Sequence, residues 1–342
     1  MSNAVEKTSD TESWLRGRTV IYLGVAWGVL SLGLFLFGAF SPESEESLWY
    51  LISTYIAELV PFLAAVALCY RNWQSPKIAS GRNVWLLLGL GTLAYFLGDL
   101  LFGVWEVYWG LDPEISPADF FFTAFYLCLG AGMLVAVFSR RLNLEKWQWA
   151  ILSTIAAIGI SIALWLSFAE PAVSTEVPNA GLATEEPATA PASTEAGLMI
   201  PLSAAPTFGG EDLSKIPQGV INLQDYLLQF AEPVNIFYII CDVGLLIISA
   251  MLLLAFWGGA FSLSWRMIAA AALARYLADM WFKYAATLPT DYVSGGFLEV
   301  FFVFSGILFA IGAALEYDVS SRPRQRRRRT SKKTEVAWVP EN

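Results

Sequence analysis

The sequence predicts an all-α integral membrane protein with eight transmembrane helices. Hydrophobic residues make up 56% of the 342-residue chain and charged residues only 15%, whereas a globular domain has about 25% charged residues. The mean hydropathy is +0.54. The apolar residues are also gathered into runs of about 20 residues, which are long enough to cross a hydrocarbon core of about 30 Å as helices.

Eight such runs follow one another along the chain. They cover residues 18–40, 48–70, 83–108, 117–138, 147–168, 234–257, 264–286 and 296–316. The predicted organisation is therefore a cytoplasmic N-terminus (1–17), helices 1–5 (18–168), a long external loop (169–233), helices 6–8 (234–316) and a cytoplasmic polybasic tail (317–342).

The composition excludes several kinds of catalytic and metal site. The chain contains no histidine, so Ser-His-Asp catalysis and imidazole metal ligation are excluded. Its three cysteines, Cys69, Cys128 and Cys241, lie inside apolar runs and have no CxxC spacing, which is typical of small buried side chains. Because no nucleophile–base pair or glycine-rich phosphate loop is present either, we expect a protein that is not an enzyme and that binds no metal or cofactor.

Charged residues in the loops predict the orientation. Arg71, Lys77 and Arg82 lie between the second and third runs, and further basic residues precede the first run and follow the fourth and the eighth. The alternate loops are acidic. Basic loops stay in the cytoplasm, so we expect both termini to be cytoplasmic, in a bacterial cytoplasmic (inner) membrane.

The segment 169–233 differs in composition from the rest of the chain. It is rich in Pro, Ala, Thr and Glu and contains a single cation, Lys215. Such a segment cannot bury enough apolar surface to offset its chain entropy, so we expect a disordered loop. Near its end, Leu223, Leu227 and Phe230 approach helical spacing, which indicates a short interfacial helix.

The segment Arg322–Lys333 carries eight cations in twelve residues. Its simplest interpretation is a stop-transfer and orientation signal. The alternative is docking on anionic membrane lipids or on an acidic partner protein, worth about 1 kcal/mol per cation near the membrane surface. No folded nucleic-acid module accompanies the run, so we expect no nucleic-acid partner. The sequence does not identify a small ligand.

The chain contains an internal repeat. The stretch YFLGDLLFGVWE (95–106) aligns with RYLADMWFKYAA (275–286), and DFFFTAFYLCLGAG (119–132) aligns with EVFFVFSGILFAIG (299–312). In both halves the two acids are 20 residues apart: Asp99 and Asp119, then Asp279 and Glu299. We therefore predict two parallel three-helix repeats, helices 2–4 and 6–8, joined by helix 5 and preceded by helix 1. Parallel repeats imply a pseudo-two-fold axis along the membrane normal.

Charged side chains inside the predicted spans are the candidate ligand- or ion-binding residues. A charge in the bilayer centre costs about 2.5–3.5 kcal/mol on insertion scales, so such residues face the bundle interior or water and find partners. The candidates are Glu58, Asp99, Glu106, Asp119, Asp242, Arg275, Asp279, Lys283 and Glu299. Most of the acids fall at one level, in the outer half of the membrane.

Each acid also has a purely structural interpretation. Asp119 opens a helix and is placed to cap it, and Asp279 is placed for an internal ion pair with Arg275 or Lys283. Glu58, Asp99 and Asp242 have no cation in their own helix, so they must borrow one, take up a proton or bind a ligand.

Two contacts follow from the same pattern. We expect Asp99 and Asp279 to approach each other across the pseudo-two-fold axis, because they hold matched repeat positions. We expect Arg275 to pair with Asp99 or Asp242 as well as with Asp279, because it lies too deep in its span to reach the outer surface.

The stretch from Gly98 to Tyr126 contains a Gly-Asp pair (Gly98-Asp99), a later acid (Glu106) and Pro-Ala-Asp (117–119) opening the next helix. Through these motifs it resembles the multi-pass membrane input modules that precede PAS, GGDEF and EAL domains in bacterial signalling proteins. The second half is similar through Tyr238 and Asp242, Ala278-Asp279, and Glu299 with the Ala-Ala-Leu ending at 313–315. The resemblance covers about 45–320 without the external loop.

The chain departs from that family in two ways. The usual Tyr-Pro before the helix-6 acid is Tyr238-Ile239, and no output domain follows Glu316. The resemblance therefore implies a stand-alone sensor or adaptor with an outward-facing acidic cavity. Two alternatives stay open: a small-solute or cation transporter built from parallel repeats, and a structural subunit of a membrane complex.

Overall fold

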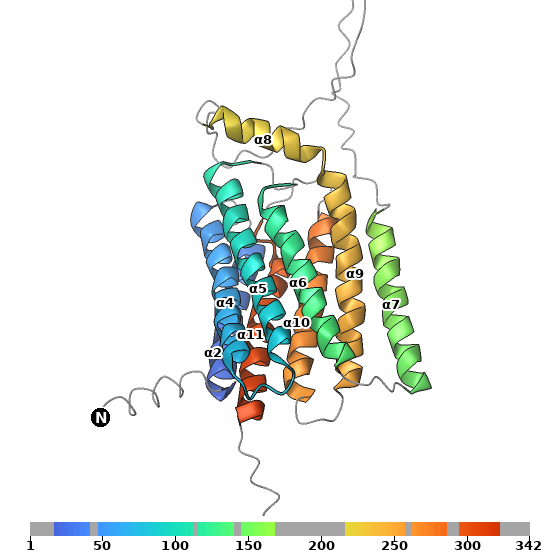
Figure 1. Ribbon diagram of the computed structural model, residues 1–342. Coiled ribbons are helices and arrows are strands. Elements are labelled where there is room, and N and C mark those ends of the chain that lie inside the picture. The colour runs from blue at the N-terminus through green and yellow to red at the C-terminus, as the bar shows by residue number, and fades with distance from the viewer. Residues whose placement is uncertain are drawn as a thin grey trace, which may run out of the picture.

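The computed structural model describes residues 17–41, 47–111, 115–139, 145–167, 216–256, 262–285 and 294–321. Within these ranges the chain is helical and contains no strand. Long helices pack side by side as a bundle, and a short helix, α8, lies across one end of it (Figure 1). We refer to this end as the α8 end.

The helices begin and end close to the predicted limits. They are α2 (Gly17–Phe40), α4 (Leu48–Gln74), α5 (Arg82–Gly103), α6 (Ala118–Phe138), α7 (Lys146–Ser167), α8 (Gln218–Leu228), α9 (Ala231–Ala255), α10 (Ser262–Ala285) and α11 (Val300–Ser321). A π-helical turn, η1 (Val104–Tyr108), extends α5, and a 3-10 turn, η3 (Phe297–Glu299), leads into α11.

Seven of the long helices are long and apolar enough to cross a membrane: α2, α4, α5 with η1, α6, α7, α9, and η3 with α11. The chain is therefore a polytopic membrane protein by length and composition. The predicted seventh span, α10, forms a helix of 24 residues. It is less apolar than the others because Arg266, Arg275, Asp279 and Lys283 lie in it.

Six of the helices close into a ring. Along the chain, α4 packs against α5, α5 against α6, α9 against α10, and α10 against α11. The ring closes because α6 also packs against α9 and α11 against α4. At the second of these contacts the side chain of Asn72 donates a hydrogen bond of 2.8 Å to the carbonyl oxygen of Ala313. Outside the ring, α2 packs against α11 and α7 against α9.

Hydrogen bonds between residues far apart in sequence show which helix ends lie together at each end of the bundle. The amide of Gly17, at the start of α2, donates to Asp318 Oδ2 near the end of α11 at 2.9 Å. The hydroxyl of Tyr50, near the start of α4, donates to the carbonyl of Gly295, before α11, at 2.8 Å. The first and last described helices therefore begin and end on the same side of the bundle, away from α8.

The structure corrects one boundary of the predicted disordered loop. Residues 218–228 form α8, the short helix that the spacing of Leu223, Leu227 and Phe230 indicated, and α9 begins at Ala231, so the range assigned to the loop ends too late. None of the side chains of α8 is buried, and Leu223 and Tyr226 are 40% and 59% exposed, as a helix at a membrane interface requires. The rest of the loop, residues 1–16 and the Arg322–Lys333 segment lie outside the described residues.

Candidate functional site

The ring encloses most of the predicted charged residues. Six of the seven acids, Glu58, Asp99, Glu106, Asp242, Asp279 and Glu299, are at most 8% exposed, while Asp119 is half-buried. Arg275 is 6% exposed, and it is the single basic side chain among the buried polar residues of the described part. Lys283 is half-buried. The ring interior thus holds far more potential negative than positive charge.

Arg275 lies at the centre of this interior. It stands four residues before Asp279 on one face of α10, and its Nε donates to Asp279 Oδ2 at 2.6 Å. Its guanidinium lies 4.4 Å from the ring centroid of Tyr95 on α5 and 4.6 Å from that of Phe302 on α11. Both distances are typical of cation–π contacts. Its Nη1 is buried and has no hydrogen-bond partner.

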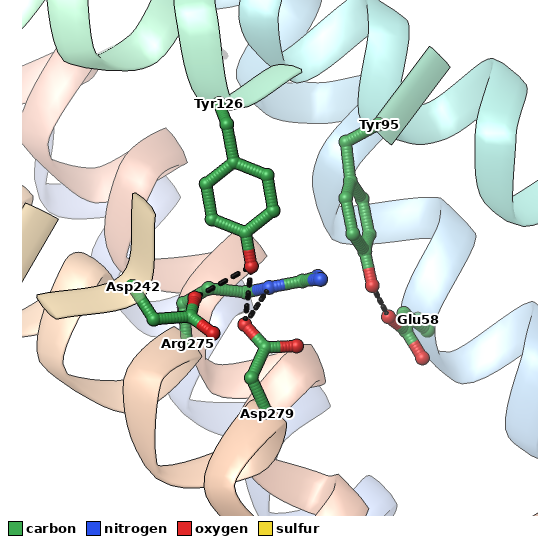
Figure 2. A network of polar contacts seen from close by, with 6 residues as sticks. All are labelled: Glu58, Tyr95, Tyr126, Asp242, Arg275 and Asp279. Carbon is green, nitrogen blue, oxygen red and sulfur yellow. Dashed lines mark hydrogen bonds and ion pairs between the residues drawn. The ribbon is translucent and has the colours of Figure 1, made fainter. Parts of the chain in front are cut away.

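Tyr126 joins α6 to two acids on the opposite half of the ring. Its hydroxyl oxygen lies 2.6 Å from Asp242 Oδ1 on α9 and 2.9 Å from Asp279 Oδ2 on α10. Figure 2 shows the Tyr126 hydroxyl pointing between the two carboxylates, with Arg275 beside Asp279. Three helices thus meet at one hydroxyl group. The second oxygen of Asp242, Oδ2, is buried without a partner.

A second tyrosine–acid pair lies on the other side of Arg275. The hydroxyl of Tyr95 donates to Glu58 Oε1 on α4, and Figure 2 shows this pair facing the guanidinium group. The Tyr95 ring also packs against Phe62 and Phe125, with centroid distances of 4.1 Å and 5.1 Å. Tyr95 thus contacts both Arg275, through its ring, and Glu58, through its hydroxyl, and Arg275 forms no ion pair with Glu58 among the described residues.

A further group of acids lies nearer the α8 end. Tyr55 donates to Glu106 Oε2 on η1, and Glu299 Oε2 accepts the Gly295 amide at 2.8 Å. Asp99 interacts electrostatically with both Glu106 and Glu299 as well as with Arg275. Its Oδ2 atom is buried and has no hydrogen-bond partner. Asp99 is therefore the acid of this group with unused capacity to bind a donor or a cation.

Asp119 has both a structural and a connecting role. Its Oδ2 accepts the Ser116 amide at 2.7 Å, which caps the first turn of α6 as the sequence indicated. Its Oδ1 accepts the hydroxyl of Tyr238 on α9 at 2.6 Å. Lys283 Nζ lies 5.7 Å from the centroid of the Tyr238 ring. Asp119 thus ties α6 to α9 next to the half-buried lysine.

The expected partners of Arg275 need a correction. Among the described residues its one ion pair is with Asp279, and it forms no second pair with Asp99 or Asp242. The rings of Tyr95 and Phe302 occupy the faces of the guanidinium group, and Asp242 is reached through Tyr126 instead. Asp99 and Asp279 are both buried and both interact with Arg275, so Arg275 connects these two repeat positions.

Sequence reasoning missed the main partners of the acids. Four tyrosines, Tyr55, Tyr95, Tyr126 and Tyr238, are each hydrogen-bonded through the hydroxyl group to an acid on another element. One signal was available, because Tyr95 aligns with Arg275 in the repeat. A tyrosine hydroxyl can satisfy a carboxyl group without carrying charge, which suits a low-dielectric interior better than further ion pairs.

The described residues contain no group of three or more Cys, Asp or Glu side chains arranged to hold a metal ion. Comparison with known proteins gives no match: no protein family, no curated protein and no solved structure is similar to this chain. The site itself offers buried carboxyl groups, four phenolic hydroxyls and one central guanidinium.

Proposed function

We propose that the protein is a membrane-embedded sensor or adaptor that binds a cationic ligand in the acidic interior of its helix ring. One observation carries the proposal: six buried acids share the interior with a single buried arginine. Uncompensated charges in a low-dielectric interior cost several kcal/mol each. The excess carboxyl groups must therefore hold protons or a bound cation, and occupancy alters the forces between the helices that carry them.

Asp99 is the best candidate for the cation contact. Its Oδ2 is buried without a partner, and it interacts electrostatically with Glu106 and Glu299. An organic cation such as an ammonium group beside Asp99 would relieve the repulsion among these carboxyl groups and give the free oxygen a hydrogen-bond donor, without requiring the arrangement of three ligands that a metal ion needs. The three acids come from α5, η1 and η3, so a ligand there connects both halves of the ring.

We also propose that α10 is the eighth membrane span. The end of α9 and the start of α10 lie far from α8 (Figure 1), whereas Gly295, just before η3, accepts a hydrogen bond from Tyr50 at the α8 end. The Ser264 hydroxyl, near the start of α10, donates to the Gly312 carbonyl near the end of α11 at 2.8 Å. The helix therefore runs antiparallel to α11 over the same thickness, with Arg275 and Asp279 buried in the ring.

Contacts between matched residues support the two parallel repeats. Trp85 and Trp265 are 180 residues apart in sequence, the same offset that separates Asp99 from Asp279. The rings of the two tryptophans contact each other at a centroid distance of 6.1 Å. Contact between equivalent residues is expected next to a two-fold axis. The ring order α4, α5, α6, α9, α10, α11 also has this symmetry, since the α6–α9 contact corresponds to the α11–α4 contact.

A close packing contact also recurs in both halves. A Cβ atom added to Gly132 on α6 would lie 3.2 Å from Leu88 Cδ2 on α5. A Cβ atom added to Gly312 on α11 would lie 2.7 Å from Ile268 Cδ1 on α10. Both pairs keep the 180-residue offset, so the same small residue lets the same two helices approach in each repeat.

The proposed orientation places both ends of the described chain in the cytoplasm of a bacterium and α8 outside. In a variant whose three native cysteines are replaced by alanine, Lys77→Cys should react with a membrane-impermeant thiol reagent only in inside-out vesicles. Gln218→Cys should react only in intact spheroplasts. Both positions are exposed. Three spans, α5, α6 and α7, separate residues 77 and 218, so labelling of both from the same side would contradict the proposed orientation.

The cation site is tested by thermal unfolding of the purified protein in detergent. We expect a small organic cation such as ethylammonium to raise the Tm beyond the effect of ionic strength, which the same concentration of NaCl controls. Saturation at 100 times the Kd stabilises by about 2.7 kcal/mol. Asp99→Asn should abolish the rise, whereas Asp225→Asn, an exposed change on α8, should keep it. A Tm that no cation raises would contradict the proposal.

A transporter is the second candidate, because repeats arranged around a central polar site are a feature of secondary transporters. Measuring the flux of protons or cations across a membrane distinguishes a transporter from a sensor. In proteoliposomes loaded with a pH-sensitive or cation-sensitive dye, a transporter should give a protein-dependent signal that Asp99→Asn removes. A sensor should give binding without flux.

A further inference from the structure

We propose that Asp242 carries a bound proton in the folded protein at neutral pH, and that this proton joins α9 to α6 and α10 through Tyr126. The inference rests on the proposed function, which requires the interior acids to hold protons or a cation. The inference extends the proposed function by assigning one proton to one carboxyl group.

The argument begins with a count of hydrogens at the Tyr126 hydroxyl. Its oxygen lies within hydrogen-bond distance of two carboxyl oxygens, Asp242 Oδ1 at 2.6 Å and Asp279 Oδ2 at 2.9 Å. A tyrosine hydroxyl has one hydrogen to donate, and an ionised carboxylate has none. Two full hydrogen bonds among these three oxygens need two hydrogens. One of the two carboxyl groups must therefore supply the second hydrogen by being protonated.

The neighbouring arginine decides which carboxyl group holds it. Arg275 Nε donates to Asp279 Oδ2 at 2.6 Å, the same oxygen that faces Tyr126. This oxygen accepts from a cation, so it is the ionised one. Asp242 makes no ion pair with any lysine or arginine that the structure describes. The Asp242 carboxyl therefore donates to Tyr126, and Tyr126 donates to the Asp279 carboxylate.

The second oxygen of Asp242 supports the same assignment. Asp242 is 1% exposed, and its Oδ2 has no hydrogen-bond partner. A buried ionised carboxylate needs hydrogen-bond donors at both oxygens. An oxygen of a carboxylate without a donor costs far more free energy than the carbonyl oxygen of a neutral acid without one. Proton uptake removes the charge and leaves only that weaker acceptor.

The groups around Asp242 come from three helices. Those that interact with it are Tyr126 on α6, Cys241 on α9 itself, and Arg275, Tyr276, Asp279 and Lys283 on α10. Its charged neighbours are thus one acid and two cations, and the acid is already paired with one of the cations. Lys283 is half-buried and makes no ion pair with Asp242.

Loss of the proton has a defined consequence. An ionised Asp242 and an ionised Asp279 would compete for the single hydrogen of Tyr126, and one of the two contacts would become a repulsion between oxygens. The junction of α6, α9 and α10 must then separate or rearrange. The site is thus a protonation switch between the two halves of the ring.

Infrared spectroscopy of the purified protein at neutral pH tests the assignment. The wild type should show a C=O stretching band of a protonated carboxylic acid that shifts in D₂O, and Asp242→Asn should remove one component of it. Tyr126→Phe should move that component without removing it, because the acid loses its acceptor but keeps its proton. The exposed change Asp225→Asn should leave the band unaltered.

Other outcomes would overturn the proposal. An unchanged band in Asp242→Asn, or loss of the same component in Asp279→Asn and not in Asp242→Asn, would place the proton elsewhere. Thermal unfolding gives a second measurement, because a native state that binds more protons than the unfolded state loses stability as pH rises. The Asp242→Asn variant should therefore lose less stability than the wild type as the pH is raised into the alkaline range. The proton and cation proposals fail separately, since the cation-dependent rise in Tm is measured through Asp99→Asn.

Discussion

Replacing Arg275 with alanine should lower the free energy of unfolding in detergent by about 3–5 kcal/mol, because it removes one member of a buried ion pair and leaves a charge without a partner. Asp279 would lose its 2.6 Å contact with the guanidinium, and the rings of Tyr95 and Phe302 would face a cavity. Chemical denaturation followed by tryptophan fluorescence measures the change.

The double variant Arg275→Ala/Asp279→Asn provides the control for charge. It should recover part of the loss, since the stranded carboxylate is gone while the cavity remains. Arg18→Ala, at an exposed position on α2, should change stability by less than about 0.5 kcal/mol. If Arg275→Ala were silent, the arginine would be hydrated, and a water-filled interior would favour the transporter over the sensor.

Replacing Trp265 with alanine should cost about 3–5 kcal/mol, as for other fully buried large aromatic side chains. Trp265 is fully buried on α10 and stacks on Phe256 at a centroid distance of 4.8 Å. It also contacts Trp85 on α5 across the ring. The loss should appear as a lower Tm and a lower denaturation midpoint.

Two variants sharpen this result. Trp149→Ala removes the same side chain from a position on α7 that is 54% exposed, and it should be nearly neutral in detergent. The pair Trp85→Ala/Trp265→Ala should cost less than the sum of the single changes, because residues in contact are not additive. Strict additivity would mean that the two tryptophans do not meet, and it would remove the main support for the pseudo-two-fold axis.

Apolar run length was enough to predict the spans. Because a helix must satisfy its own backbone hydrogen bonds inside a membrane, each long apolar run had one available structure. For α6, the prediction of 117–138 differs by one residue from the observed Ala118–Phe138. Prediction was weakest where polarity is mixed. The spacing of Leu223, Leu227 and Phe230 indicated the short helix α8, but the range assigned to the disordered loop, 169–233, still included it, because that range was set by the composition of the whole segment.

The candidate residues were predicted as a set but not as pairs. Helical periodicity places Arg275 and Asp279 on one face of α10, and their contact follows from that spacing alone. It does not say which helix faces them. The expected second ion pair of Arg275 was wrong because aromatic rings from α5 and α11 cover the guanidinium, and that depends on how the ring closes.

The sequence by itself determined the membrane class, the limits of most helices and the burial of most charged residues within the spans, because these depend on hydropathy and on helical spacing. Only the tertiary structure decided that six helices close into a ring and that tyrosines rather than cations meet the acids. The reason is physical: a hydroxyl satisfies a carboxyl group only at about 2.6–2.9 Å, and the packing of distant helices, not the order of residues along the chain, sets that distance.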